Sequence, residues 1–79
     1  MTDEKIIAKL QQVFTGVFGK SLAFDPMLDR RDASHWTSLK HVEFIIALER
    51  EFGVRFDGAD ATDMTSIPLV IERIQQRLQ

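Results

Sequence analysis

Residues 36–54 read WTSLKHVEFIIALEREFGV and carry the clearest helical pattern in this 79-residue chain. The segment Ser38–Phe52 contains no glycine, proline or asparagine that would interrupt a helix. Gly53 follows directly, and glycine is typical of the left-handed position that ends a helix. Thr37 and Ser38 each carry a hydroxyl that can cap the N-terminus. We therefore expect a helix over Ser38–Phe52.

This predicted helix has apolar residues on two opposite faces. With Phe44 placed at zero, one stripe covers about 0° to 100° of the helix circumference and contains His41, Phe44, Ile45, Leu48 and Phe52. A second stripe lies at about 160° to 220° and contains Leu39, Val42 and Ile46, bordered by Glu43, Glu49 and Arg50. Two interpretations remain open for the second stripe. Either residues 20–36 bury it, or it is an exposed ridge that docks a partner.

Apolar residues at helical spacing predict two further long helices. The first covers residues 3–18, with Thr2 or Asp3 as its N-cap and Gly19 at its end. The second covers residues 66–78, with Thr65 as its N-cap and Pro68 in the first turn, where a missing N–H does no harm. The polar segment 57–63 has room for at most a turn or two of helix.

The segment 20–36 has no helical periodicity, and connections of this length are uncommon in compact domains. We expect it to be packed rather than disordered, because it carries five large apolar residues, namely Leu22, Phe24, Met27, Leu28 and Trp36. Val54 and Phe56 are expected to fold back onto the core. No segment alternates as a strand would, so the predicted fold class is all-α.

Length, composition and charge narrow the classes of protein further. Residues 1–79 suffice for a single domain, and 44% apolar with 28% charged residues is ordinary globular composition. The absence of cysteine excludes disulfides, thiolate metal sites and a cysteine nucleophile. A net charge of −2 argues against nucleic-acid binding. Neither a membrane span nor a signal peptide is evident, so we expect a cytoplasmic protein that binds no membrane. We also expect it to be a monomer.

Ser38 is the residue of greatest chemical interest because of its position. A helix N-terminus binds anions through its free N–H groups and its positive dipole end. A phosphodiester attached to Ser38 would lie against those groups, and Lys40 adds a nearby positive charge. A capping role for the Ser38 hydroxyl is the simpler explanation, and position alone does not decide between the two.

Residues 36–54 resemble the signature of acyl carrier proteins, in which Asp-Ser-Leu precedes an apolar helix and an Ala-Leu-Glu-x-Glu-Phe segment. Ser38-Leu39 and Ala47–Phe52 match this pattern. Trp36 and the Glu-Phe-Gly-Val ending are most similar to stand-alone carriers of specialised acyl pathways. The flanking helices also fall where the family has them. The resemblance implies a four-helix bundle of the acyl carrier type, with three long helices and one short third helix.

The resemblance also implies a function. In the family, a magnesium-dependent phosphopantetheinyl transferase moves 4′-phosphopantetheine from coenzyme A to the serine that matches Ser38. The thiol of this arm carries acyl groups as thioesters between acyl-loading and acyl-processing enzymes of fatty-acid, polyketide or related biosynthesis. Such a carrier is not itself an enzyme. The positions used in the family for partner docking match Leu39, Val42, Glu43, Ile46 and Glu49.

The sequence departs from the family pattern in two respects. Thr37 stands where the family normally has Asp, which removes a carboxylate that would contact basic groups on the transferase. Residues 38–52 have a net charge of only −1, so partners that steer toward a strongly acidic helix would gain little association rate. We infer a dedicated set of partners. The alternative is a carrier-fold interaction domain that is not phosphopantetheinylated.

Two histidines raise the question of metal binding or catalysis. His35 and His41 do not have the i, i+4 spacing of a helical zinc site, and we expect no metal. Ser38 and His41 have a spacing at which they can meet on a helix, but no orienting acid accompanies them. His41 is expected at the edge of the core and His35 in a loop, with no catalytic residue in the chain.

Overall fold

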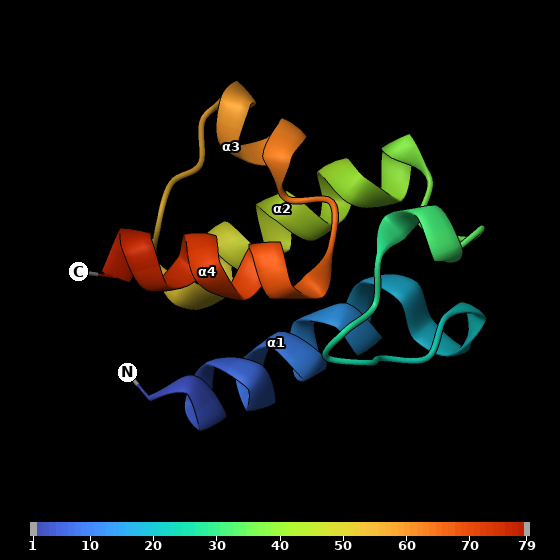
Figure 1. Cartoon of the computed structure of the whole chain (residues 1–79), viewed down its shortest axis with the longest axis horizontal. Helices are drawn as coiled ribbons and strands as arrows, with labels where there is room; N and C mark the ends of the chain where they lie inside the picture. Colours follow the sequence, from blue (N-terminus) through green and yellow to red (C-terminus); the bar gives the residue numbers. More distant parts are fainter. Residues whose placement is uncertain (1, 79) are drawn as a thin grey trace.

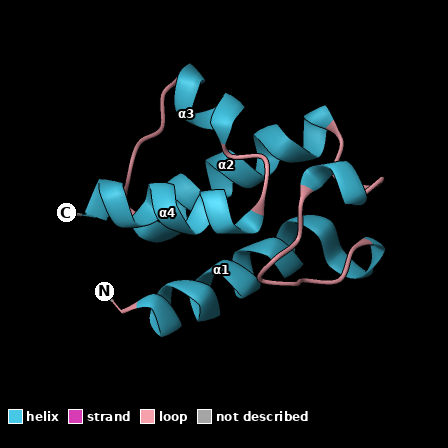
Figure 2. Cartoon of the chain, viewed as in Figure 1, coloured by secondary structure: helices cyan, strands magenta, loops and turns pink. Residues whose placement is uncertain are grey.

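The computed structural model describes residues 2–78, which form four α-helices and no strand (Figures 1 and 2). The helices are α1 (Asp3–Phe18), α2 (Ser38–Phe52), α3 (Gly58–Asp63) and α4 (Ile67–Leu78). Two short 3-10 turns, η1 (Gly19–Ser21) and η2 (Arg30–Asp32), lie in the connection between α1 and α2. The expected all-α class is confirmed for these residues: α1, α2 and α4 are long, and α3 is short.

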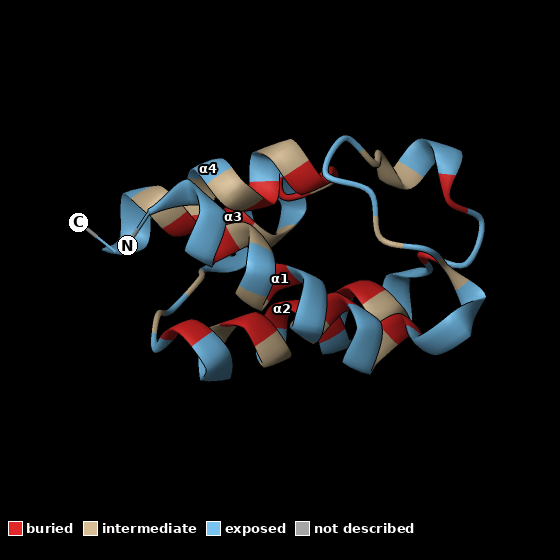
Figure 3. Cartoon of the chain, turned by 90° about the horizontal axis from the view of Figure 1, so that it is seen from below, coloured by how far each residue is buried: buried red, intermediate tan, exposed pale blue. Residues whose placement is uncertain are grey.

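The three long helices enclose the core. α1 packs against both α2 and α4, and the two ends of the described chain lie on the same side of the molecule (Figure 1). In Figure 3 the buried residues of each long helix alternate with exposed ones, as expected for helices with one inward face. The side chains with no more than 1% exposure are Ile6, Leu10, Phe14, Phe44, Leu48, Met64, Ile67, Val70 and Ile74.

Aromatic rings fill the space between α1 and α2. The ring of Phe14 meets those of Phe24, Trp36 and Phe44 edge to face, at centroid distances of 5.4, 6.2 and 5.7 Å. Phe18 makes the same kind of contact with Trp36 and Phe44, both at 5.7 Å. Because edge-to-face pairs stabilise beyond their area burial, this cluster ties the loop residue Trp36 to both helices.

Most of the predicted helix ends are confirmed. The Thr2 hydroxyl accepts from the Lys5 N–H, and Gly53 ends α2 in the left-handed conformation, with φ of 65° and ψ of 35°. The predicted cap of the last helix is wrong. α4 begins at Ile67, and the Ser66 hydroxyl, not that of Thr65, accepts from the Leu69 N–H at 3.3 Å. The carbonyl of an N-cap residue accepts the first hydrogen bond of the helix. The Thr65 carbonyl instead accepts from the Arg30 N–H, and the Ser66 carbonyl accepts from the Val70 N–H, so the helix starts after Ser66.

The connection between α1 and α2 is held against the start of α4. Two backbone hydrogen bonds, from Arg30 to Thr65 (2.9 Å) and from Ile67 to Leu28 (2.8 Å), flank an isolated antiparallel bridge between Asp29 and Ser66. Four of the five apolar residues predicted to pack do so, with Trp36 only 2% exposed. Met27 is the exception, at 76% exposure, because it lies in a turn and residues 25–27 are all exposed.

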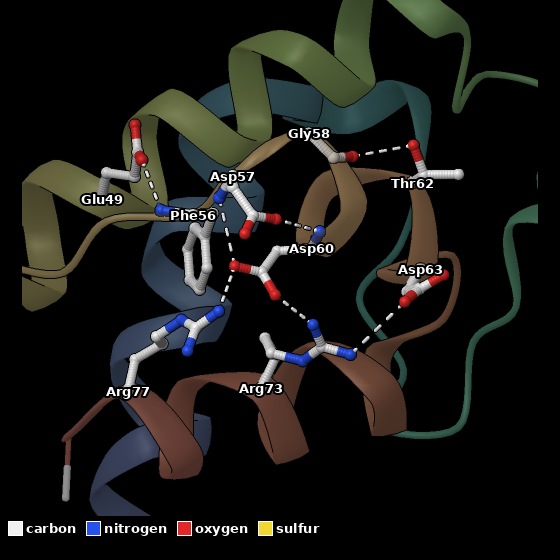
Figure 4. A network of polar contacts seen from close by, with 9 residues as sticks. All are labelled: Glu49, Phe56, Asp57, Gly58, Asp60, Thr62, Asp63, Arg73 and Arg77. Atoms are coloured by element: carbon white, nitrogen blue, oxygen red, sulfur yellow. Dashed lines mark hydrogen bonds and ion pairs between the residues drawn. The ribbon is translucent and has the colours of Figure 1, made fainter.

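A polar cluster around Asp60 holds α3 against α4 (Figure 4). The buried carboxylate of Asp60 accepts from the guanidinium groups of Arg77 and Arg73. Asp57 and Asp60 also form a capping box at the start of α3. The hydrogen bond from Arg77, aided by the backbone of Asp57 and by Arg73, outweighs burial and lowers the pKa of Asp60 from 3.8 to about 2. The carboxylate therefore remains ionised at neutral pH.

None of the helices described over residues 2–78 combines the length and apolar character needed to cross a membrane.

Candidate functional site

Ser38 is the first residue of α2, and its hydroxyl is not used as the helix cap. The Thr37 hydroxyl accepts from the Lys40 N–H at 3.2 Å and makes that cap. Ser38 is exposed at the surface. Of the two roles left open for the Ser38 hydroxyl, capping is therefore excluded, and the group is accessible to a reagent from solution.

The positive charge beside Ser38 comes from Arg30, in η2. Its Nη2 donates to the Ser38 Oγ at 3.2 Å, and its Nε donates to the Trp36 carbonyl at 3.1 Å. Lys40, the expected source of charge, is engaged elsewhere. Its Nζ donates to the Val17 carbonyl at 3.1 Å and pairs with the Glu43 carboxylate at 3.3 Å.

Sequence reasoning missed Arg30 because nothing local indicates its contact with Ser38. The two residues are eight positions apart, in a segment without periodicity. The contact forms because η2 is anchored to the start of α4, a long-range interaction. The only local signal is the Asp29 side chain, which accepts from the Arg31 N–H at 2.9 Å and caps η2.

His41 is a structural residue at the edge of the core, as expected. Its Nδ1 accepts from the Trp36 indole N–H at 2.9 Å, and its Nε2 lies 2.7 Å from the Ala61 carbonyl. These partners imply the neutral tautomer with the proton on Nε2. Because both ring nitrogens are engaged, His41 does not serve as a base for Ser38.

The second apolar stripe of α2 is exposed. Leu39 is 69% exposed, Val42 55% and Ile46 48%, so the interpretation that residues 20–36 bury this face is wrong. Glu43 is exposed on the same face. Glu49 is half-buried, and its carboxylate accepts from the Phe56 N–H at 2.8 Å (Figure 4), which secures the chain after α2.

Several grooves border α2, and two of them bear on the site. One of about 320 Å³ lies between α2 and α3 and includes Ser38 and Arg30, together with His41, Val42, Ala61 and Thr62. The other, of about 510 Å³, lies between α1 and α2 and is lined by Val13, Val17, Ile46 and Ala47 among others. Ser38 thus lies at the edge of the first groove, beside Arg30 and Val42.

Within residues 2–78, no cluster of three or more histidine, aspartate or glutamate side chains has the geometry to hold a metal ion.

The site therefore combines an accessible hydroxyl, a guanidinium and the N-terminus of a long helix. Both positive features favour a negatively charged substituent on Ser38. Both ring nitrogens of His41 already have hydrogen-bond partners, so neither is free to accept a proton from the Ser38 hydroxyl in this structure.

Comparison of the chain with models of known protein families gave no match, and comparison with curated proteins gave none either.

Proposed function

We propose that this protein is a phosphopantetheine-dependent acyl carrier whose attachment residue is Ser38. One observation carries the proposal: Ser38 is an exposed, non-capping serine at the N-terminus of a long helix, and Arg30 donates to its hydroxyl. A serine needed only for capping would occupy the position of Thr37. The resemblance of residues 36–54 to the carrier signature supplies the identity of the substituent.

The modification is a phosphoryl transfer that the chain accepts but does not catalyse. The Ser38 Oγ attacks the β-phosphorus of coenzyme A, the bond from phosphorus to the bridging oxygen breaks, and 3′,5′-ADP leaves. A base of the transferase takes the hydroxyl proton. When bound, the arm supplies a terminal thiol that holds acyl groups as thioesters. The chain contributes the hydroxyl and a positive environment for the phosphodiester.

The helix arrangement supports the proposal. Three long helices with a short one between α2 and α4 are compatible with the carrier type of bundle that the resemblance implies. The Asp60 cluster holds α3 against α4, and the contact of His41 Nε2 with the Ala61 carbonyl joins α3 to α2, so the groove next to Ser38 is part of the folded structure.

The proposed docking surface is the outer face of α2. Leu39, Val42 and Ile46 form an exposed apolar ridge next to Ser38, and the Glu43 carboxylate borders it. Apolar side chains with a charged rim suit transient protein contacts. Glu49 lies on the same face, but its carboxylate is already hydrogen-bonded, so we expect a smaller share of docking from it.

The test is intact-mass measurement after incubation with coenzyme A, magnesium and a promiscuous phosphopantetheinyl transferase. We expect the wild-type chain to gain one phosphopantetheine and Ser38→Ala to gain none. Ser34→Ala is the matched control, because Ser34 is another exposed serine in the adjoining loop, and this variant should be modified normally. No gain by the wild type with several transferases would contradict the proposal and favour the unmodified interaction domain that Thr37 suggests.

A further inference from the structure

The Arg30 guanidinium donates to the Trp36 carbonyl through Nε and to the Ser38 hydroxyl through Nη2. A phosphodiester on Ser38 would offer Nη2 a charged acceptor at the same place. We propose that the Arg30 guanidinium binds the phosphate of the arm attached to Ser38 and so directs the base of the arm toward the groove between α2 and α3. This inference rests on the proposed function. It assigns a binding residue, in η2 and outside the signature of residues 36–54, to the attached group.

The guanidinium is already oriented before any phosphate is present. Its Nε donates to the Trp36 carbonyl at 3.1 Å, which holds the plane of the group, while Nη2 points to the Ser38 Oγ at 3.2 Å. Trp36 is itself held, because it is 2% exposed and its indole N–H donates to His41. The side-chain entropy of Arg30 is therefore largely lost on folding, not on binding.

The backbone that carries Arg30 is equally well held. The Arg30 N–H donates to the Thr65 carbonyl at 2.9 Å, and the Ala33 N–H donates back to the Arg30 carbonyl at 3.1 Å. η2 is thus bound to the chain just before α4 while its arginine side chain reaches α2. This arrangement keeps a cation at the Ser38 hydroxyl, although most of the connection between α1 and α2 has no regular structure.

The two other cations close to this site in the sequence are committed elsewhere. Arg31 projects into solvent with a side-chain exposure of 88%, and its Nε pairs with Asp29 at 3.2 Å. The Lys40 ammonium donates to the Val17 carbonyl and forms an ion pair with Glu43. Arg30 is therefore the cation that the fold directs to Ser38.

Modification would strengthen the contact that Arg30 already makes. In the unmodified chain Nη2 donates to a neutral hydroxyl oxygen. After transfer that oxygen is an ester oxygen, and the attached phosphorus carries two further oxygens that share one negative charge. Hydrogen bonds to ionised acceptors are roughly twice as strong as neutral ones, so the guanidinium would move to a phosphate oxygen. Lysine would provide the charge and donors on a single nitrogen, but not the rigid planar group that donates to the Trp36 carbonyl through Nε and to the phosphate through Nη2.

The test compares Arg30→Gln, Arg30→Lys and the control Arg31→Gln, all modified with the same transferase. We expect Arg30→Gln to shift the phosphorus NMR resonance of the attached phosphodiester and to lower kcat/KM for modification about 10-fold or more, the equivalent of one charge-assisted hydrogen bond. For both readouts, Arg30→Lys should give values between those of the wild type and Arg30→Gln, and Arg31→Gln should match the wild type. A thermal melt of each variant shows that the comparison is made on folded protein.

A second measurement needs no variant. In the wild-type chain, the nitrogen resonances of the Arg30 side chain should shift between the unmodified and the modified form, whereas those of Arg31 should not. Unchanged Arg30 resonances, or a phosphorus resonance that Arg30→Gln leaves in place, would overturn the role of Arg30 while the carrier function stands. A wild-type chain that accepts no arm would overturn both proposals.

Discussion

The two faces of α2 contain similar residues but have opposite environments. Phe44 and Leu48 on the inner face are fully buried, whereas Val42 and Ile46 on the outer face are about half exposed. An apolar side chain contributes to stability only when folding removes it from water. The inner face therefore stabilises the bundle, and the outer face is available for contacts with other molecules.

Replacement of Phe44 by alanine should have the largest effect on stability. The ring contacts Phe14, Phe18 and Trp36, and its removal leaves a cavity in the core that costs about 3–5 kcal/mol. In so small a chain this loss is a large part of the total. Chemical denaturation monitored by circular dichroism measures it. If Phe44→Ala lowered the free energy of unfolding no more than a substitution at an exposed position does, the assignment of the inner face as the buried one would be contradicted.

Asp60→Asn should destabilise the protein by about 1.5–3 kcal/mol at neutral pH, because it removes the charge that Arg77 and Arg73 contact. The folded-state pKa is about 2, below the ordinary value of 3.8. The stabilisation is therefore present above pH 3.8 and is lost as the pH falls through about 2. Denaturation curves of both proteins across this range should converge at low pH. A difference that stays constant would contradict the role of ionised Asp60.

His41→Leu tests the polar member of the inner face. It removes the acceptor of the Trp36 indole N–H and the partner of the Ala61 carbonyl. An unsatisfied buried group costs about 1–3 kcal/mol, so we expect a destabilisation of that size, again measured by denaturation. Transferase modification of the folded fraction should persist. Its loss in folded protein would indicate that His41 acts on Ser38 after all.

Val42→Asp and Ile46→Asp should have the smallest effect on folding, within about 0.5 kcal/mol of the wild type, because both side chains are exposed. The same variants should raise the KM of the transferase, since they place a charge in the proposed docking surface. Melting curves and modification kinetics give both values. A large loss of stability, or unchanged kinetics, would contradict the division between the two faces.

The two apolar stripes of α2 and the inward direction of the first were predictable, because helical periodicity is a local property. The positions of the apolar residues predicted the bounds of α1 and α2 and the buried side of α2, including His41. They left open whether the second stripe is buried or exposed, because that depends on where residues 20–36 lie. Their packing against the start of α4 leaves the outer face uncovered.

The polar contacts were predicted less well than the apolar ones. Arg30 reaches Ser38 across eight positions, and Asp60 meets Arg73 and Arg77 across 13 and 17. No periodic pattern connects such pairs, because the fold as a whole brings them together. The cap of α4 was misplaced by one residue for the same reason, since pairing of Thr65 with Arg30 leaves Ser66 at the helix start.

The central claim is that Ser38 carries a phosphopantetheine arm, and peptide-level mass spectrometry of the transferase-treated protein tests it most directly. The attached group should be found on Ser38, with none on the neighbouring hydroxyls of Ser34 and Thr37. An unmodified Ser38 after treatment with active transferases, or an attached group at another residue, would contradict the account.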